Sequence, residues 1–365
     1  EGLLRLIKNL SDMIPHVSED EDYGFIDRVS EDEYRKILGS ANGKIIPVSK
    51  KIEDLLRMEE EMRKDRRIVA TRHCELVETE QEIRIFNSNG LSVEARKILY
   101  VLSGLCVSRD KDDVSWYDYV WATDYDDLDF LSFATDLREK ALSFLGAENL
   151  KTGIYSGILS PRASTEFLAI LSHSFLSENL FKDKTRLKGR LGSRVFSPLL
   201  TIESDGSLGM SALPFDGEGF PCKPISVVEN GYFRSFLYDS FYARKYKVES
   251  TGNCLRESIT QSPRCGVIGM YIVPSESLPE LGDGEIMIED LMGTHTANPI
   301  TGEFSFGAQG YIMRNGVIRP FIGVIVAGNI FELFKNVKGI GKDIKFYGNF
   351  GSPSLYVTDL KISGL

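Results

Sequence analysis

The first long helical pattern in the chain is an apolar stripe near residues 50–65. Leu55, Leu56, Met58 and Met62 carry this stripe, and three consecutive glutamates interrupt it at positions that would face water. Apolar residues that recur every three to four positions share one face of an α-helix, so the spacing predicts a helix over 50–65. We expect the two methionines to be core residues rather than part of a cofactor site.

Beyond this helix the pattern changes to the alternation that is typical of β-strands. The predicted strands are residues 83–86, 91–95, 98–109 and 115–122. The first two flank the sequence Asn-Ser-Asn-Gly, which predicts a hairpin turn. The strands are followed by an amphipathic helix at 131–145, and Gly146 is suited to the position just past its end.

In the second half of the chain, turn signals separate short apolar runs. Asp-Gly or Asn-Gly pairs predict hairpins at residues 205–206, 230–231 and 315–316. A strand is predicted at 152–159 and a long helix at 163–181, with Ser160 or Ser164 as its N-cap. A further helix is predicted after Asn329, with the Gly-Ile-Gly sequence at 339–341 as its stop signal.

These elements predict an α+β fold, with largely antiparallel β-sheets and packed helices. At 365 residues the chain exceeds the ~250 to 300 residues over which a single hydrophobic core usually extends. We therefore expect more than one unit, with a boundary near residue 150 that divides an α+β region at 1–150 from a β-rich region at 151–365. No strand, glycine-rich loop and helix follow one another as a doubly wound nucleotide fold requires.

Charge and cysteine content narrow the function classes. The net charge of −10 shows no segregated basic surface, so we expect no direct contact with nucleic acid. Five scattered cysteines without a Cys-x-x-Cys pair argue against a disulfide framework or a zinc knuckle. The longest apolar run, residues 321–328, is too short to span a membrane. We expect a cytoplasmic protein, and the start without Met suggests that a native N-terminal segment precedes this sequence.

The spacing of the histidines does not indicate a metal site or a histidine-activated nucleophile. The chain has 4 histidines, and no two lie close enough in sequence to form a local metal-binding pair. His173 stands between two serines on the predicted long helix, where neighbouring side chains point apart, which favours a core or interface role. His295 lies in a polar loop at 293–299, and such loops on a β scaffold often bind ligands.

Several segments of the C-terminal region resemble one known family. The resemblance rests on Pro-Phe-Asp-Gly-Glu-Gly at 214–219, Asp-Leu-Met-Gly at 290–293, Pro-Ile-Thr-Gly-Glu-Phe-Ser-Phe-Gly at 299–307 and Ala-Gly-Asn at 327–329, with shorter matches between them. In order and spacing the chain resembles the TldD/PmbA (TldE) family, specifically from residue 152 and more loosely before it. The resemblance implies that this sequence lacks the first part of the family's N-terminal domain.

The resemblance implies a cytoplasmic, zinc-dependent peptidase system that acts on unfolded or short peptides and whose older label is modulator of DNA gyrase. In that system TldD-type and PmbA/TldE-type subunits pair. TldD-type subunits carry His-Glu-x-x-x-His on the long helix and a cysteine near the C-terminus as zinc ligands, and the glutamate is the general base.

This chain departs from the TldD pattern at the metal positions. The resemblance places Leu168 and Ala169 where the first histidine and the glutamate would stand, and leaves His173 near the second histidine. Residues 349–352 contain no cysteine. We therefore expect a PmbA/TldE-type chain with no metal ligands and no catalytic residues of its own, and zinc in a TldD-type partner. Substrate-groove candidates are His173, His295, Phe306 and Gly307.

Two other functions stay open at this stage. The chain could be a homodimeric metallopeptidase whose zinc ligands, such as His173, His295 or a cysteine, are assembled from unexpected places. It could also be a non-enzymatic modulator that holds a peptide without cleaving it. The sequence leaves the partner open as well, because a TldD-type subunit and a second copy of this chain are both compatible with it.

Overall fold

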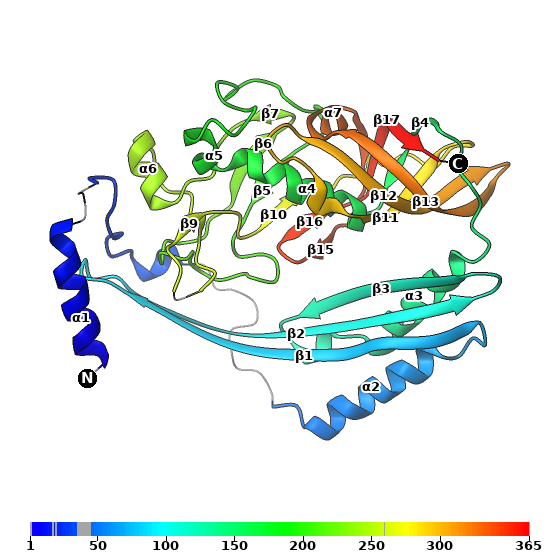
Figure 1. The fold of residues 1–365 in the computed structure, drawn as a ribbon, viewed down its shortest axis with the longest axis horizontal. Coiled ribbons are helices and arrows are strands. Elements are labelled where there is room, and N and C mark those ends of the chain that lie inside the picture. Colours follow the sequence, from blue (N-terminus) through cyan, green and yellow to red (C-terminus); the bar gives the residue numbers. More distant parts are fainter. Residues whose placement is uncertain (1, 17, 19, 35–44, 259, 365) are drawn as a thin grey trace.

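The computed structural model describes residues 2–16, 18, 20–34, 45–258 and 260–364, which form two hydrophobic cores. One core is built from residues between Ile46 and Phe144, and we call this part the sheet unit. The other is built from residues between Leu150 and Ile362, and we call this part the barrel unit. Figure 1 shows the long strands of the sheet unit lying beneath the barrel unit.

The sheet unit consists of three long antiparallel strands and two helices. The strands are β1 (Ile68–Phe86), β2 (Ser92–Arg109) and β3 (Asp113–Ala122), hydrogen-bonded in that order. The helices α2 (Val48–Met62) and α3 (Phe130–Ser143) contact each other and the sheet. A short 3-10 turn, η3 (Tyr125–Asp127), precedes α3. β3 is a free edge of this sheet, and it faces the barrel unit (Figure 1).

The predicted methionine core of α2 is confirmed, since Met58 and Met62 are completely buried. Leu56, however, is 57% exposed, so its assignment to the buried stripe is wrong. Its position in the helix directs it away from the sheet. The helix at 131–145 is confirmed with small shifts of its ends, and Gly146 has the expected left-handed φ of 71°.

The first predicted hairpin is longer than the sequence pattern indicated. Residues 91–95 and 98–109 belong to one strand, β2, which pairs with β1 from Ile68 opposite Ser108 to Phe86 opposite Ser92. The two short strands expected on either side of residues 96–97 are therefore one element. Lys97 stays in the ladder opposite Gln81, and its ammonium group donates hydrogen bonds to the carbonyl oxygens of Met210 and Ala212 in the barrel unit.

Residues 20–34 of the N-terminal segment contact the barrel unit. The segment contains α1 (Gly2–Met13), η1 (Ile14–His16) and η2 (Glu31–Glu33). Arg244 donates hydrogen bonds to the backbone oxygens of Asp22, Gly24 and Phe25. The ring of Tyr23 packs 4.4 Å, centroid to centroid, from that of Phe241.

In the barrel unit, five strands form a closed ring. They are β4 (Gly153–Leu159), β11 (Ile286–Met292), β12 (Glu303–Arg314), β13 (Val317–Asn329) and β17 (Leu355–Ser363). The ring closes because β17 pairs with both β4 and β13, and β14 (Val337–Ile340) extends it beside β17. The pairings are antiparallel except for β4 with β11.

A second six-stranded sheet completes the barrel unit. Its order is β15 (Lys345–Tyr347), β16 (Phe350–Ser352), β10 (Met270–Ile272), β5 (Ile202–Ser204), β6 (Ile225–Glu229) and β7 (Tyr232–Phe233). The short strands β8 (Cys254–Leu255) and β9 (Arg264–Cys265) pair separately. The remaining helices are α4 (Pro161–Ser172), η4 (His173–Phe175), α5 (Ser177–Phe181), α6 (Ser240–Tyr246), η5 (Thr294–Thr296) and α7 (Ile330–Lys335). The largely antiparallel α+β architecture expected from the sequence is confirmed.

The long helix predicted at 163–181 is divided into three pieces. Ser160 caps α4 by accepting a hydrogen bond from the Ala163 amide, which confirms one of the two proposed caps. The helix ends at Ser172 because the chain then pairs with a distant backbone segment. Phe175 accepts a hydrogen bond from the Leu237 amide, and the Ser177 amide donates to Leu237. This tertiary pairing overrides the helical pattern.

Two of the three predicted Asx-Gly hairpins are confirmed. Asn230 and Asn315 have φ values of 50° and 52°, as the turns between β6 and β7 and between β12 and β13 require. The pair at 205–206 does not form a hairpin, because β5 pairs with β6 across a long loop. The Gly-Ile-Gly sequence is also not a helix stop, since α7 ends at Lys335 and Gly339 lies in β14.

Candidate functional site

His173 is the C-cap residue of α4, at the surface of the barrel unit. Its carbonyl oxygen accepts a hydrogen bond of 2.6 Å from the Asn179 side chain. The pKa of His173 is lowered, first because the surrounding protein shields part of the ring from water and second because Arg264 is positively charged. The imidazole is therefore neutral over a wider pH range than a free histidine.

His295 lies in the exposed turn η5. The hydroxyl of its neighbour Thr294 donates a hydrogen bond of 3.0 Å to Glu166 on the exposed face of α4. This bond brings the 293–299 loop to the helix on which the family resemblance places its metal motif. Among the hydrogen bonds and ion pairs of the described residues, none joins His295 to His173.

Phe306 and Gly307 occupy neighbouring positions of β12 with different surroundings. Phe306 is 1% exposed, and its ring packs with those of Phe304 and Phe167 at centroid distances of 5.1 and 5.9 Å. Gly307 is half-buried, and a β-carbon placed there would lie 3.4 Å from Met292, an ordinary contact. In this structure Phe306 is thus a core side chain, whereas Gly307 leaves room above the strand.

The region of the family's metal motif is apolar at its centre. Leu168 is completely buried and Ala169 is partly buried on α4. β16 packs against this helix, so Ser352 lies on the strand next to it. The Ser352 hydroxyl donates to the backbone oxygen of Pro353. Within the described residues, no group of three or more His, Cys, Asp or Glu side chains is placed to hold a metal ion.

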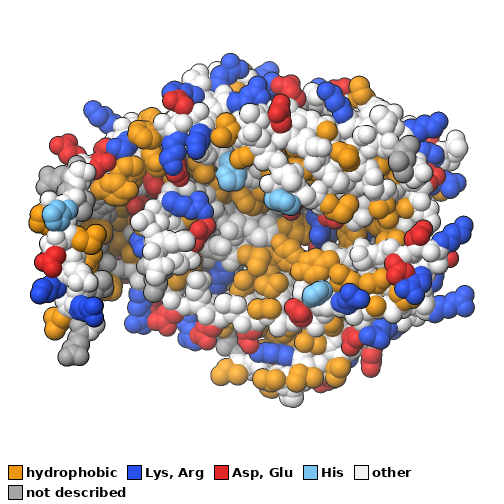
Figure 2. Space-filling view, in the orientation of Figure 1, with side chains coloured by type: hydrophobic (Ala, Val, Ile, Leu, Met, Phe, Trp, Pro, Cys, Tyr) orange, Lys and Arg blue, Asp and Glu red, His pale blue; other side chains and the backbone are white. Residues whose placement is uncertain are grey.

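A cavity lined by charged and aromatic side chains lies elsewhere, between the two units. It has a volume of about 700 Å³ and is bounded by β3 and α3 of the sheet unit and by α4, β11, β12 and β15 of the barrel unit. We call it the junction cavity. Its lining residues are Trp116, Asp118, Tyr119, Val120, Trp121, Phe133, Asp136, Leu137, Glu139, Lys140, Ser143, Arg162, Glu289, Tyr311, Lys345, Phe346 and Tyr347. Figure 2 shows hydrophobic side chains gathered along this junction.

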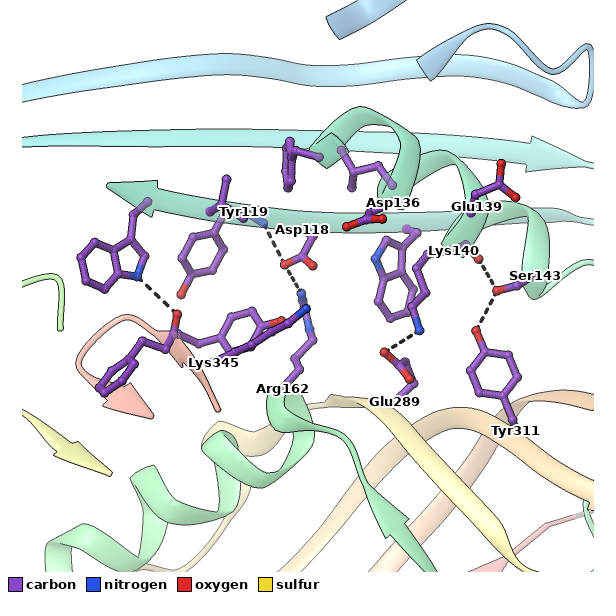
Figure 3. Close-up of a pocket in the computed structure, with 17 residues that line it drawn as sticks. Asp118, Tyr119, Asp136, Glu139, Lys140, Ser143, Arg162, Glu289, Tyr311 and Lys345 are labelled. Carbon is purple, nitrogen blue, oxygen red and sulfur yellow. Dashed lines mark hydrogen bonds and ion pairs between the residues drawn. The ribbon is translucent and has the colours of Figure 1, made fainter. Parts of the chain in front are cut away.

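Arg162 crosses the junction cavity from the first turn of α4 (Figure 3). Its guanidinium group pairs with Asp118 on β3 at 2.8 Å and with Asp290 on β11 at 2.6 Å. The same group lies 5.6 Å from the ring centroids of Trp116 and Tyr347. Burial raises the pKa of Asp118, and the charge of Arg162 opposes that rise. One cation thus holds two carboxylates, one from each unit.

Lys140 and Glu289 make a second ionic link across the cavity. The ammonium group of Lys140 on α3 lies 2.7 Å from Oε1 of Glu289. It also lies 5.3 and 5.9 Å from the ring centroids of Tyr311 and Trp116. Glu289 is only 8% exposed, and its Oε2 atom is buried without a hydrogen-bond partner. Ser143 and Tyr311 share a hydrogen bond of 2.7 Å beside this pair.

The junction cavity was not predicted from the sequence. Trp116, Asp118, Tyr119 and Trp121 stood within a predicted strand, and their density of aromatic side chains was the available signal. The sequence did not show that this strand is an edge facing Glu289, which is separated from it by more than 160 residues. None of His173, His295, Phe306 and Gly307 is among its lining residues.

A second cavity, of about 720 Å³, lies between the N-terminal segment and the helices α5 and α6. Its acidic groups are engaged in holding the fold. Asp239 caps α6 through the Tyr242 amide, and Glu218 accepts hydrogen bonds from the amide and the hydroxyl of Ser240. Burial raises the pKa of Asp239 to about 6. These carboxylates secure α6, whereas Glu289 in the junction cavity keeps one buried oxygen without a hydrogen-bond partner, so the junction cavity is the better candidate site.

Comparison with known families finds two adjacent matches. Residues 152–364 match the C-terminal domain of the PmbA/TldA metallopeptidases, and residues 41–145 match their central domain. An uncharacterized protein of Methanocaldococcus jannaschii is 32% identical over 74% of this chain and 64% of its own length. The metalloprotease PmbA of Escherichia coli O157:H7 is 26% identical over 77% of this chain and 62% of its own length. The chain thus spans less than two thirds of these relatives.

Solved structures give the same fold over nearly the whole chain. A candidate modulator of DNA gyrase from Thermotoga maritima has a TM-score of 0.85 and 27% identity, over 94% of this chain and 81% of its own. TldE from Thermococcus kodakarensis has a TM-score of 0.81 over 98% of this chain and 84% of its own. Its identity of 22% supports a common fold alone. Among the described residues, no helix has both the length and the apolar character that a membrane span requires.

Proposed function

The chain belongs to the PmbA/TldD metallopeptidase family, and from that premise we propose that it is a PmbA/TldE-type subunit of a zinc-dependent peptidase system. Its substrates are unfolded or short peptides. A TldD-type partner supplies the zinc ion and its ligands, and this chain supplies part of the surface that holds the peptide.

The composition of α4 carries the proposal. A catalytic zinc site takes three protein ligands and a water molecule, with a carboxylate nearby as general base. At the corresponding positions this chain offers Leu168, Ala169 and His173, and the neighbouring strand offers Ser352. One imidazole and one hydroxyl engaged with a backbone oxygen do not fit a catalytic zinc ion. No step of the peptidase reaction is therefore assigned to residues of this chain.

Free sheet edges support a peptide-holding role. An extended peptide binds a sheet by adding a strand, which needs an edge with unpaired backbone groups. The ring of strands in the barrel unit closes between β13 and β17, so its own strands leave few such edges. Among the described strands, edges remain at β1 and β3 of the sheet unit and in part at β15, where the Phe346 carbonyl oxygen accepts from Trp121. β7 is covered, because its residues pair with residues 192–194. β3 and β15 both border the junction cavity.

Reconstitution tests this proposal. The chain would be purified alone and together with a TldD-type chain, and each preparation would be assayed on an unfolded peptide with and without a chelator. We expect cleavage only in the mixture, abolished by the chelator. A mixture in which a stable complex forms but the peptide stays intact would contradict the proposal.

A variant at His173 separates the proposal from an independent metallopeptidase. His173→Ala removes the imidazole that a metal site of this chain would need, while the exposed position of the ring limits the cost to folding. We expect the mixture to keep its zinc and its chelator-sensitive cleavage in His173→Ala, because the TldD-type partner supplies the zinc ligands. Chelator-sensitive cleavage by the chain alone, lost in His173→Ala, would favour the homodimeric enzyme instead.

A further inference from the structure

Glu289 in the junction cavity has one carboxylate oxygen that the protein leaves unused. Its Oε1 atom forms an ion pair with the ammonium group of Lys140. Its Oε2 atom is buried and has no hydrogen-bond partner. A buried acceptor without a partner destabilises the fold, so such atoms are usually satisfied. At 8% exposure the residue is well enclosed, and it lines a cavity large enough for a ligand. Oε2 is closed to the cavity in this structure, so an incoming donor reaches the carboxylate of Glu289 when Lys140 moves away from it.

The side chains around Glu289 show which kind of donor the place suits. Lys140 already holds its ammonium group against this carboxylate, within 6 Å of the rings of Trp116 and Tyr311. A carboxylate with aromatic faces on either side is a favourable environment for an ammonium group. The position of Lys140 thus shows how an ammonium group binds to Glu289 beside these two rings. Lys140 is 35% exposed, so its side chain has room to rotate outward, and an incoming ammonium group then replaces the positive charge that Glu289 loses.

The charges around the cavity favour a cation over an anion. Four carboxylates line it, together with three cationic side chains. Arg162 is committed to Asp118 and to Asp290, a further carboxylate behind the lining. Among the described residues, Asp136 makes no hydrogen bond or ion pair, and it lies one helical turn from Lys140 on α3. Glu139 is paired with Arg138, and four lining carboxylates against three lining cations leave a net charge of −1, a slight preference for a cation.

We propose that the junction cavity binds an alkylammonium group, the side chain of a lysine in an extended peptide, with its nitrogen on Glu289 between Trp116 and Tyr311. The peptide source rests on the proposed function, because it takes the ligand from the class of substrate proposed above. The peptide backbone lies along the edge of β3, which flanks the cavity, because the Phe346 carbonyl oxygen on β15 already accepts a hydrogen bond from Trp121. Lys140 occupies the place when no peptide is bound.

The chain provides a specific optical reporter of this cavity. It contains 2 tryptophans, Trp116 and Trp121, and both line the cavity. Tryptophan emission therefore reports on this site and on no other. We would titrate the purified chain with an amino-terminally acetylated peptide that has one lysine, and with the same peptide carrying norleucine at that position. Butylamine, which copies the lysine side chain without a backbone, forms a third arm.

We expect the lysine peptide to change the emission saturably and the norleucine peptide to bind at least about tenfold more weakly, because it lacks the charge-assisted hydrogen bond. Weaker binding of butylamine than of the lysine peptide would assign the site to peptides. Equal binding would assign it to small amines and overturn the peptide source. No saturable change with either the lysine peptide or butylamine would overturn the whole proposal.

Two variants with opposite expected effects distinguish binding from a structural role. Glu289→Gln keeps the shape but loses the charge, and we expect about tenfold weaker binding of the lysine peptide. Lys140→Met removes the internal competitor, and we expect tighter binding. Glu303→Gln is the matched control, because it removes an exposed carboxylate outside the cavity, and its affinity should equal that of the unchanged chain. Weakening in both cavity variants would indicate lost structure and contradict the proposal.

The peptide titration and the reconstitution experiment can give opposite outcomes, so each tests its own proposal. If the lysine peptide does not bind in the cavity but the mixture with a TldD-type chain cleaves peptides, the cavity proposal is wrong and the subunit proposal stands. If the peptide binds and Glu289→Gln weakens it but the mixture cleaves nothing, the subunit proposal is wrong and the cavity is still an ammonium site.

Discussion

Substitution of Arg162 tests whether the polar links across the junction cavity hold the two units together. Arg162→Met keeps most of the apolar length of the side chain but removes the charge. It leaves Asp118 on the sheet unit and Asp290 on the barrel unit without their shared cation. The side chains of all three residues are between 20% and 25% exposed, so the carboxylates are largely shielded from water.

The magnitude follows from this burial. Removing one partner of a buried ion pair costs about 3–5 kcal/mol, because an uncompensated charge is left behind. Partial exposure of Asp118 and Asp290 lets water recover part of that cost, so we expect a loss of about 2–4 kcal/mol in the free energy of unfolding. Arg84→Met is the matched control. Arg84 also bridges two carboxylates, Glu82 and Glu94, but its side chain is 64% exposed.

The assay is urea unfolding followed by tryptophan emission, because both tryptophans lie at the affected junction. We expect Arg84→Met to change stability by less than about 1 kcal/mol. Equal effects of the two substitutions would refute the argument from burial.

The pH dependence of the Arg162→Met variant gives a second check. Burial already raises the pKa of Asp118, and loss of Arg162 raises it further. A folded state that holds a proton more tightly than the unfolded state loses stability as the pH rises. The deficit of the variant should therefore be larger at neutral pH than near the ordinary pKa of a carboxyl group.

Three further predictions concern the fold. Met58→Ala should lower the free energy of unfolding by about 2–5 kcal/mol, measured by urea titration, because the side chain is completely buried. Gly157→Ala should abolish soluble expression, since the new β-carbon would stand 1.8 Å from the Ile286 carbonyl oxygen, whereas Gly307→Ala should fold normally. Burial raises the pKa of Asp216 to about 8, so the folded state keeps a proton there that the unfolded state releases, and stability should fall as the pH rises from about 4 to 8. Asp216→Asn should flatten that slope, and an unchanged slope would refute the assignment.

Sequence patterns predicted turns, helix caps and buried helix faces, because each of these depends on residues that are close together in the chain. The Asn-Gly turns at residues 230 and 315, the Ser160 cap and the buried face of α2 each follow from a few neighbouring residues. The end of α4 could not be predicted in this way, because the hydrogen bonds between 175–177 and Leu237 that stop it come from a segment sixty residues away.

The candidate site depends on contacts that are still more distant in sequence. The ring of strands closes through β13 and β17, and the parallel pair β4 and β11 joins segments more than 120 residues apart. Only this closure places Glu289 opposite Trp116 and Lys140. Sequence patterns indicate which residues of a strand share a face, but they do not indicate which strand that face will meet.

The central claim is that this chain is a subunit without a zinc ion of its own. The most direct measurement is the zinc content of the chain purified alone and in complex with a TldD-type chain, by elemental analysis. We predict negligible zinc in the chain alone and about one zinc ion per pair in the complex, held by the partner. About one zinc ion per chain in the isolated protein, lost in His173→Ala, would contradict the claim.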